Sequence, residues 1–269
     1  MNAVTRSDHG MKHPILFLLL SSLFLVHTSA QERQWFRVST YHLSSETAEA
    51  LFDKTFAEAV APAFKRQGVE PVGVFAPVNL EKDKDKAVPR QRYVITPLSS
   101  PDQLASISAK MGEDAEFMEK ASAYLGVGKE APIYSRVESS LLYAFEGMPR
   151  LVVPKKETDN TRLFELRVYE SHSELKGKMK VQMFNQGEIE IFNAVGLNCV
   201  FFGEAFIGKN LPNLTYMAVY NDEAHREDVW KKFLDHPKWD EMKKMEVYKD
   251  TVSKIISQHM KPLPYSMIQ

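Results

Sequence analysis

The sequence predicts an α+β fold built from two tandem repeats, each with the order β-α-β-β-α-β. Three observations predict it: a strand pattern of period two that occurs twice, an amphipathic helix after each copy, and a matching closing strand in each half. The repeats cover residues 34–150 and 161–269. Residues 151–160, which are polar after Pro154, are the predicted linker between them.

The opening strands alternate apolar and polar residues, and both end in tyrosine. A long helix is predicted after each strand. In the first half an apolar stripe ends at Gly68, where a C-cap belongs, and Pro62 is expected to kink or end the helix early. In the second half the cap signature 171–174 starts a helix expected to run to about Gly196. The two strands are 35–41 (WFRVSTY) and 163–169 (LFELRVY).

The later elements also match between the halves. A second helix is predicted in each half, and Ser100 and Asp222 are the expected N-caps. With a closing strand, each half forms a split β-α-β unit, which gives a ferredoxin-like antiparallel sheet with both helices on one face. The remaining predicted strands are 72–76, 92–95 and 135–139 in the first half, and 199–203, 215–219 and 253–257 in the second.

The sheet face that the helices leave uncovered has to be buried. Two ferredoxin-like sheets packed face to face bury both faces and can close a shared barrel. The chain is therefore expected to form an intrachain dimeric α/β barrel, a pseudo-dimer with the isologous packing of a two-fold pair. Two unrelated α+β domains are the alternative. A further homo-oligomer through edge strands stays open.

Residues 1–30 are predicted to be a secretory signal peptide. Lys12 precedes the apolar run 14–26, and small residues lead to a cleavage site expected after Ala30. Met11 offers an alternative start for this signal. The run is too short to span a bilayer comfortably, so no membrane span is expected after cleavage and the protein is predicted to be secreted or periplasmic. An uncleaved anchor is the alternative.

The composition excludes several classes of function. The 269 residues include 34 Lys+Arg and 35 Asp+Glu, so the net charge is -1 and nucleic acid is not an expected partner. A single cysteine, Cys199, excludes an internal disulfide and a cysteine-rich zinc site. The sequence also lacks the linear motifs of zinc proteases, serine hydrolases and dinucleotide-binding proteins, so no metal and no cofactor is predicted.

Four segments of the second half carry a family resemblance: 164–169, 233–239, 251–255 and 262–266. With them the second half resembles the NIPSNAP family. Through segments 61–68 and 72–75, the first half is similar to the divergent N-terminal repeat of exported bacterial NIPSNAP-like proteins, although it lacks the His-Pro-x-Trp element. The resemblance implies the dimeric α/β barrel and little about chemistry. Other barrels of this kind include cofactor-free oxygenases and haem-handling proteins, but fold is not function.

The strand 163–169 supplies most of the candidate ligand-binding residues. Its apolar face is expected under the helices, so its polar face should look between the two sheets, alongside Arg37 and Tyr41. Charges buried there must be paired or must line a wet cavity. One interpretation is a site for a small anionic or carbonyl-bearing ligand, because arginine matches carboxylate or enolate oxygens. The residues of the polar face are Glu165, Arg167 and Tyr169.

A purely structural role for these charges is the alternative. Glu165 then forms an ion pair with Arg37 or with Arg167, and the polar face holds no ligand. The ligand-site interpretation and the ion-pair interpretation predict different responses to mutation, since only the second makes Arg167 essential for stability.

His236 is a further candidate residue. Imidazole exchanges protons near neutral pH, so His236 is suited to act as an acid or base. The structural interpretation is favoured instead: Pro237 begins a short helix and Trp239 anchors it in the core.

Two classes of function follow from these observations. Missing catalytic motifs favour a non-catalytic module that binds a small ligand or a protein partner outside the cytoplasm. The alternative is a cofactor-independent oxygenase- or isomerase-like enzyme that acts in the barrel cavity; its catalytic residues are unknown. A pocket between the sheets with His or Tyr beside an Arg would favour the enzyme. A barrel filled with apolar side chains would favour the binding module.

Overall fold

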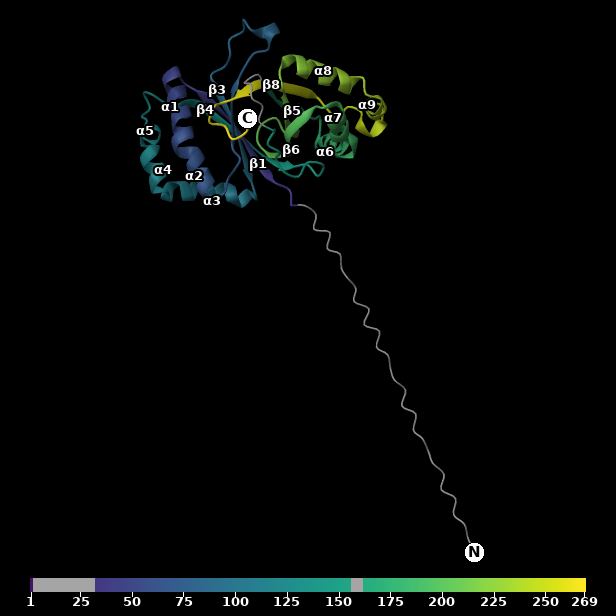
Figure 1. The fold of residues 1–269 in the computed structure, drawn as a ribbon, viewed down its shortest axis with the longest axis horizontal. Coiled ribbons are helices and arrows are strands. Elements are labelled where there is room, and N and C mark those ends of the chain that lie inside the picture. The colour runs from purple at the N-terminus through teal and green to yellow at the C-terminus, as the bar shows by residue number, and fades with distance from the viewer. Residues whose placement is uncertain (2–31, 156–161) are drawn as a thin grey trace. The chain divides into compact units, whose positions relative to one another are not determined.

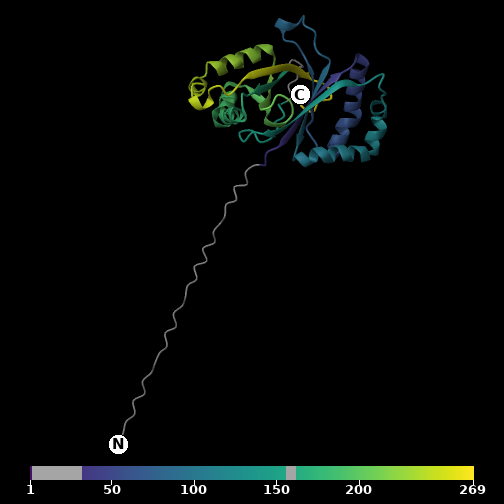
Figure 2. The same ribbon diagram turned by 180° about the vertical axis from the view of Figure 1, so that it is seen from behind.

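The structure, a computed structural model, describes Met1, residues 32–155 and residues 162–269. The predicted signal peptide beyond Met1 and the second half of the predicted linker, residues 156–160, lie outside the described residues. The fold is shown in Figure 1 and, from behind, in Figure 2.

In the described part of the chain, eight antiparallel strands close into one barrel with the order β1-β3-β2-β8-β5-β7-β6-β4. Each repeat supplies four adjacent strands in the same relative order, and the pairs β2·β8 and β4·β6 close the barrel. The prediction of two ferredoxin-like repeats packed as an intrachain dimeric α/β barrel is confirmed. The strands are β1 (Trp35–Leu43), β2 (Gly73–Pro77), β3 (Gln91–Leu98), β4 (Tyr134–Ala144), β5 (Leu163–Glu170), β6 (Asn198–Ile207), β7 (Asn213–Tyr220) and β8 (Lys254–Pro262).

The helices of each repeat cover the outside of its own half of the barrel, so the two helical layers lie on opposite sides (Figures 1 and 2). The first layer contains α1 (Glu46–Thr55), η1 (Phe56–Val60), α2 (Ala61–Arg66), α3 (Pro101–Glu113), α4 (Ala115–Lys120) and α5 (Ser122–Leu125). The second contains α6 (Glu174–Met183), η3 (Phe184–Glu188), α7 (Ile189–Val195), α8 (Glu223–Leu234) and α9 (Pro237–Met242). Two short 3₁₀ turns, η2 (Glu81–Asp83) and η4 (Glu246–Tyr248), lie in connections.

Side-chain caps begin the second helix of each repeat as predicted. The Ser100 hydroxyl accepts the Gln103 N–H, and the Asp222 carboxylate accepts the His225 N–H at 2.7 Å. The long helix of the second repeat begins after Ser173 rather than at Ser171, because it is the Ser173 hydroxyl that accepts a helical N–H.

The long helix of both repeats contains a five-residue π-helical turn, η1 or η3, which follows ten helical residues. In the first repeat the helix continues past Pro62 to Arg66, so the prediction of an early end is wrong. Pro62 stands in the first turn of α2, directly after the π turn, where a missing N–H is tolerated.

Three apolar layers build the core. One fills the barrel and the other two lie between each half-barrel and its helices. Both faces of the barrel sheet are therefore buried over much of their area. Each strand packs one set of side chains into the barrel and the alternate set against the helices. The barrel interior is filled by apolar residues that include Phe36, Phe75, Ile95, Leu142, Phe164, Phe201, Met217 and Met260.

The faces of β1 and β5 are the reverse of the predicted ones. Phe164 and Leu166 point into the barrel, and Glu165 faces α8, from which Arg226 reaches its carboxylate. Strand alternation shows that two faces differ, but it does not show which face meets the helices when both are buried.

Candidate functional site

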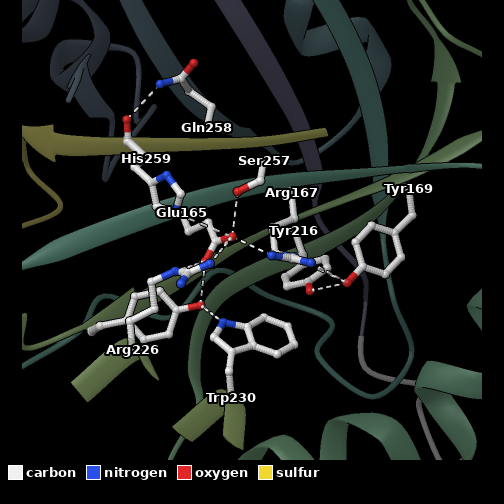
Figure 3. Close-up of polar contacts among 10 residues, drawn as sticks. Glu165, Arg167, Tyr169, Tyr216, Arg226, Trp230, Ser257, Gln258 and His259 are labelled. Atoms are coloured by element: carbon white, nitrogen blue, oxygen red, sulfur yellow. Dashed lines mark hydrogen bonds and ion pairs between the residues drawn. The ribbon is translucent and has the colours of Figure 1, made fainter. Parts of the chain in front are cut away.

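Glu165 is the centre of a buried polar cluster between β5 and α8 (Figure 3). Its side chain is fully buried. The oxygen Oε2 accepts hydrogen bonds from the Tyr220 hydroxyl and from Arg226 Nε, both at 2.9 Å. The oxygen Oε1 accepts from the Ser257 hydroxyl at 2.6 Å and from Arg167 Nη1. Three strands and one helix thus converge on a single carboxylate.

Arg167 links this carboxylate to a pair of tyrosines. Its Nη2 donates to the Tyr169 hydroxyl at 3.1 Å, and that hydroxyl lies 3.0 Å from the Tyr216 hydroxyl. The guanidinium also lies 4.5 Å from the ring centre of Trp230, whose Nε1 donates to the Tyr220 hydroxyl at 2.8 Å. The cluster supplies its own hydrogen-bond partners.

The charges in the cluster keep Glu165 ionised. Burial is the largest influence and opposes ionisation, but the Arg167 charge and the hydrogen bonds from Arg226 and Ser257 outweigh it and lower the pKa of Glu165 to about 2. Burial and the nearby carboxylate raise the pKa of Tyr220, so its hydroxyl stays protonated and can donate. The Glu165–Arg167 ion pair that the sequence left as an alternative is present.

His259 stands beside the cluster without joining its hydrogen bonds. Its Nε2 lies 3.7 Å from the Glu165 carboxylate and has no hydrogen-bond partner among the described residues. Burial lowers the pKa of His259, so the ring is neutral at neutral pH and adds no charge. Figure 3 shows the neighbouring Gln258 pointing away from Glu165, as strand alternation requires.

The structure brings Glu165, Arg167 and Tyr169 together but places Arg37 and Tyr41 elsewhere. The last two face α1 and α2, on the outer side of the first half-barrel. The prediction that all five residues look into one cavity between the sheets is wrong. The outward faces of the two half-barrels point in opposite directions, so these residues belong to separate helix–sheet layers.

His236 lies at the N-terminus of α9. Its carbonyl accepts the Trp239 N–H at 3.0 Å, and the Trp239 ring packs 4.5 Å from the Phe233 ring. In the described part of the chain, no hydrogen bond or ion pair connects His236 with the Glu165 cluster, and its Nδ1 is buried without a partner. This arrangement agrees with the structural interpretation, in which Pro237 begins the helix and Trp239 anchors it.

A cavity of about 170 Å³ opens at the end of the barrel where β1 and β5 finish. We call it the barrel-mouth cavity. Both repeats line it, and its walls are of two kinds. The apolar wall is formed by Val38, Leu166, Val168 and Ile256. The polar wall includes His42, Gln91, Tyr93, Glu138, Lys209 and Gln258.

Five polar side chains of this cavity form one hydrogen-bonded chain. Lys209 Nζ donates to Glu138 Oε2 at 2.6 Å, and His42 Nε2 lies 3.1 Å from the same oxygen. The Gln91 amide lies 3.0 Å from His42 Nδ1, and the Tyr93 hydroxyl donates to the Gln91 carbonyl at 2.9 Å. Both imidazole nitrogens are thus engaged, with Nδ1 accepting and Nε2 donating.

The charges at the mouth cancel. Hydrogen bonds from Lys209 and His42 lower the pKa of Glu138, so this carboxylate is ionised and pairs with the Lys209 ammonium. Burial raises the pKa of Tyr93 to about 12, and the hydroxyl stays protonated. The cavity therefore offers hydrogen-bonding groups around a balanced charge pair, which suits a neutral polar group on a ligand.

Sequence reasoning missed this cavity because it assigned the wrong face of β1. With the correct face, the alternation of the strand indicates the lining: Val38, Thr40 and His42 lie on the side that faces the cavity. Lys209 lies in the β6–β7 turn, and nothing in the local sequence indicates that it reaches the other repeat.

Among the described residues, no group of three or more His, Cys, Asp and Glu side chains is placed to hold a metal ion. None of the helices in those parts of the chain is long and apolar enough to cross a membrane.

Solved structures share the fold. A putative monooxygenase from Lactobacillus acidophilus is 12% identical with a TM-score of 0.55, and the match covers 86% of this chain and 94% of that one. A second protein of that description, from Fusobacterium nucleatum, is 11% identical with a TM-score of 0.53, over 87% of this chain and 94% of that one. At these identities the likeness shows the fold alone.

A solved NIPSNAP-like structure and the NIPSNAP family model each match part of the chain. A NIPSNAP-like domain protein from Burkholderia xenovorans is 20% identical, with a TM-score of 0.35, over 40% of this chain and 90% of that one. No curated protein matches the chain. The NIPSNAP family model matches residues 164–267, which hold β5, α8, β8 and the whole Glu165 cluster. The second repeat therefore matches the NIPSNAP family.

Proposed function

We propose that this protein binds a small, ring-sized molecule with one neutral polar group in the barrel-mouth cavity and releases it unchanged. The cavity itself carries the proposal, because an apolar wall faces a polar wall in a space of about 170 Å³. An engineered apolar cavity of about 150 Å³ in another protein binds benzene, so the volume suits one substituted ring. A carbonyl or hydroxyl group on the ring matches the amide and hydroxyl groups of Gln91, Tyr93 and Gln258.

The hydrogen bonds at the mouth support binding without catalysis. A general base needs a free nitrogen or oxygen within hydrogen-bond reach of its substrate. Both nitrogens of His42 are bonded to protein groups, so the imidazole offers no free nitrogen. The Oε2 atom of Glu138 is engaged by Lys209 as well as by His42, which leaves Oε1 as the acceptor that a ligand can reach. The apolar filling of the remaining barrel interior also fits a binding module.

Cyclohexanone and phenol are suitable probes, with benzene as the control that lacks a polar group. Saturation-transfer NMR with the protein should detect both polar probes more strongly than benzene. The variant Ile256→Phe fills the cavity and should abolish the signal. Ile255→Phe is the matched control, because Ile255 is the adjacent residue on the opposite face of β8 and is 49% exposed.

Two results would contradict the proposal. Equal probe signals from Ile256→Phe and Ile255→Phe would place binding elsewhere. Time-dependent conversion of either probe by the protein would support the enzyme alternative and overturn a purely binding role.

We also propose that the protein is exported, with residues 1–30 removed as a signal peptide. The apolar run 14–26 behind Lys12 and the small residues before Ala30 support this. N-terminal sequencing of the mature protein should begin at Gln31. A mature chain that keeps the apolar run would contradict the proposal.

A further inference from the structure

Arg37 is an arginine with no counterion in the described part of the chain. It lies on the outward face of β1, below the long helix of the first repeat, and its guanidinium carbon is 6.0 Å from the ring centre of Phe64. Its Nε is buried and has no hydrogen-bond partner. Among the residues that the structure describes, none forms an ion pair or hydrogen bond with Arg37.

A cavity of about 50 Å³ adjoins this guanidinium, and we call it the Arg37 cavity. Hydroxyl-bearing residues, Tyr41 and Thr55, share its lining with phenylalanine rings. Directly opposite Arg37 on β3 lies Thr96, which is fully buried and whose hydroxyl has no partner among the described residues. Unused hydrogen-bond donors thus lie at or near a small cavity, and such groups are rare in folded proteins.

Two acidic residues of α1, the helix packed against β1, pair with another arginine and not with Arg37. Glu49 and Asp53, both on α1, are engaged by Arg92, whose contacts with them measure 2.5 and 2.7 Å. The Arg37 side chain is partly exposed, so water reaches part of its guanidinium, but its Nε–H is buried without an acceptor. A small anion matches a cationic N–H donor of this kind, and the cavity limits it to a few heavy atoms.

We propose that the Arg37 cavity binds a small planar oxyanion of the carboxylate or nitrate class. The guanidinium supplies a planar pair of N–H donors that matches two oxygens of such an anion, and the nearby hydroxyls of Tyr41 and Thr96 supply further donors. Burial raises the pKa of Tyr41, so its hydroxyl stays protonated for this purpose. The site lies on the outer side of the sheet and is independent of the barrel-mouth cavity and of the function proposed for it.

Thermal unfolding of the full protein in sodium formate or sodium nitrate, at constant ionic strength, tests the site. The wild-type Tm should rise and then saturate in the millimolar range. Arg37→Met should lose the response, with at least a tenfold weaker apparent affinity. Arg136→Met is the matched control, because Arg136 is an exposed arginine on the neighbouring strand β4, and it should respond like the wild type.

A second variant tests the site from the opposite direction. Thr96→Asp places a carboxylate opposite Arg37, where it should take the place of the oxyanion. This variant should lose the formate response and should gain Tm in buffer without formate. A saturable formate response retained by Thr96→Asp or by Arg37→Met would overturn the proposal, as would a wild-type Tm with no saturable response.

Discussion

The two repeats share a backbone plan but use the same strand position in opposite ways. Arg37 on β1 and Glu165 on β5 hold equivalent positions, opposite Thr96 and Ala218 on the third strand of their repeats. In the second repeat the acid is held by two arginines, whereas in the first repeat the arginine has no acid. The barrel-facing positions next to them do not differ in this way. Phe36, which precedes Arg37, and Phe164, which precedes Glu165, are both apolar and fully buried.

The helices explain the difference. Counted from the N-cap, Arg226 on α8 occupies the place of Leu104 on α3, and Leu104 packs in the apolar layer of the first repeat. The second repeat therefore brings a cation to its strand acid, but the first repeat brings a hydrocarbon side chain to its strand cation. The barrel holds the two repeats together, and the helix–sheet layers are free to differ in chemistry.

Breaking the Glu165 cluster of the second repeat should have the largest effect on the free energy of unfolding. Glu165→Ala leaves Arg167 and Arg226 side by side without a counterion, and we expect a loss of about 3–5 kcal/mol in the free energy of unfolding. Urea denaturation measures it. The control Glu190→Ala breaks an exposed pair with Lys238 and should cost less than about 1 kcal/mol. A cost for Glu165→Ala as small as that of the control would show that the cluster does not stabilise the fold.

Acid should remove the same stabilisation gradually. The pKa of Glu165 is about 2 in the folded protein and 4.5 ordinarily, so between these values the unfolded chain binds more protons. Stability should rise with pH over this window, by about 3 kcal/mol from this group, and be lost as pH falls towards 2. Urea denaturation at several pH values should give a flatter profile for Glu165→Gln. Parallel profiles for variant and wild type would refute this origin of the pH dependence.

The fold could be predicted from sequence because its signals are local. Period-two strands, capping residues such as Ser100 and Asp222, and the order of elements are all written in short segments. Once two such repeats occur in one chain, the need to bury the second face of each sheet leads to the barrel.

The site could be predicted only in part. Glu165, Arg167 and Tyr169 do contact one another, because alternate residues of one strand share a face. The side on which they lie was not predictable, since both faces of the strand are buried. Arg226 and Trp230 complete the cluster from a distant helix, and their arrival depends on packing that no short pattern encodes.

A smaller loss of stability is expected from Trp230, which completes the Glu165 cluster of the second repeat. Trp230→Phe removes the N–H that donates to Tyr220 and weakens the contact with the Arg167 guanidinium, so we expect a loss of about 1–2 kcal/mol. Trp35→Phe is the control from the first repeat, because the Trp35 ring packs against Tyr143 in a tilted arrangement and has no hydrogen bond from its indole among the described residues. Equal losses in the two variants would mean that ring volume, and not the polar contacts, explains the effect.

The smallest predicted effect compares the two strand-ending tyrosines directly. The Tyr169 hydroxyl is bonded to Arg167 and Tyr216, so Tyr169→Phe should cost about 1 kcal/mol in the free energy of unfolding. The equivalent Tyr41 hydroxyl has no hydrogen bond to any described residue, so Tyr41→Phe should change stability by less than about 0.5 kcal/mol in buffer without oxyanion.

With formate present, the variant that loses more should be Tyr41→Phe, when the loss is measured as the formate-induced rise of Tm. If the Tyr41 hydroxyl donates to a bound oxyanion, Tyr41→Phe should reduce the rise of Tm with formate, while Tyr169→Phe should leave that rise unchanged. Thermal unfolding of both variants with and without formate separates the two roles, because each hydroxyl then matters under one condition only. The same response to formate in both variants would mean that Tyr41 takes no part in the site, and that the two repeats differ there in charge alone.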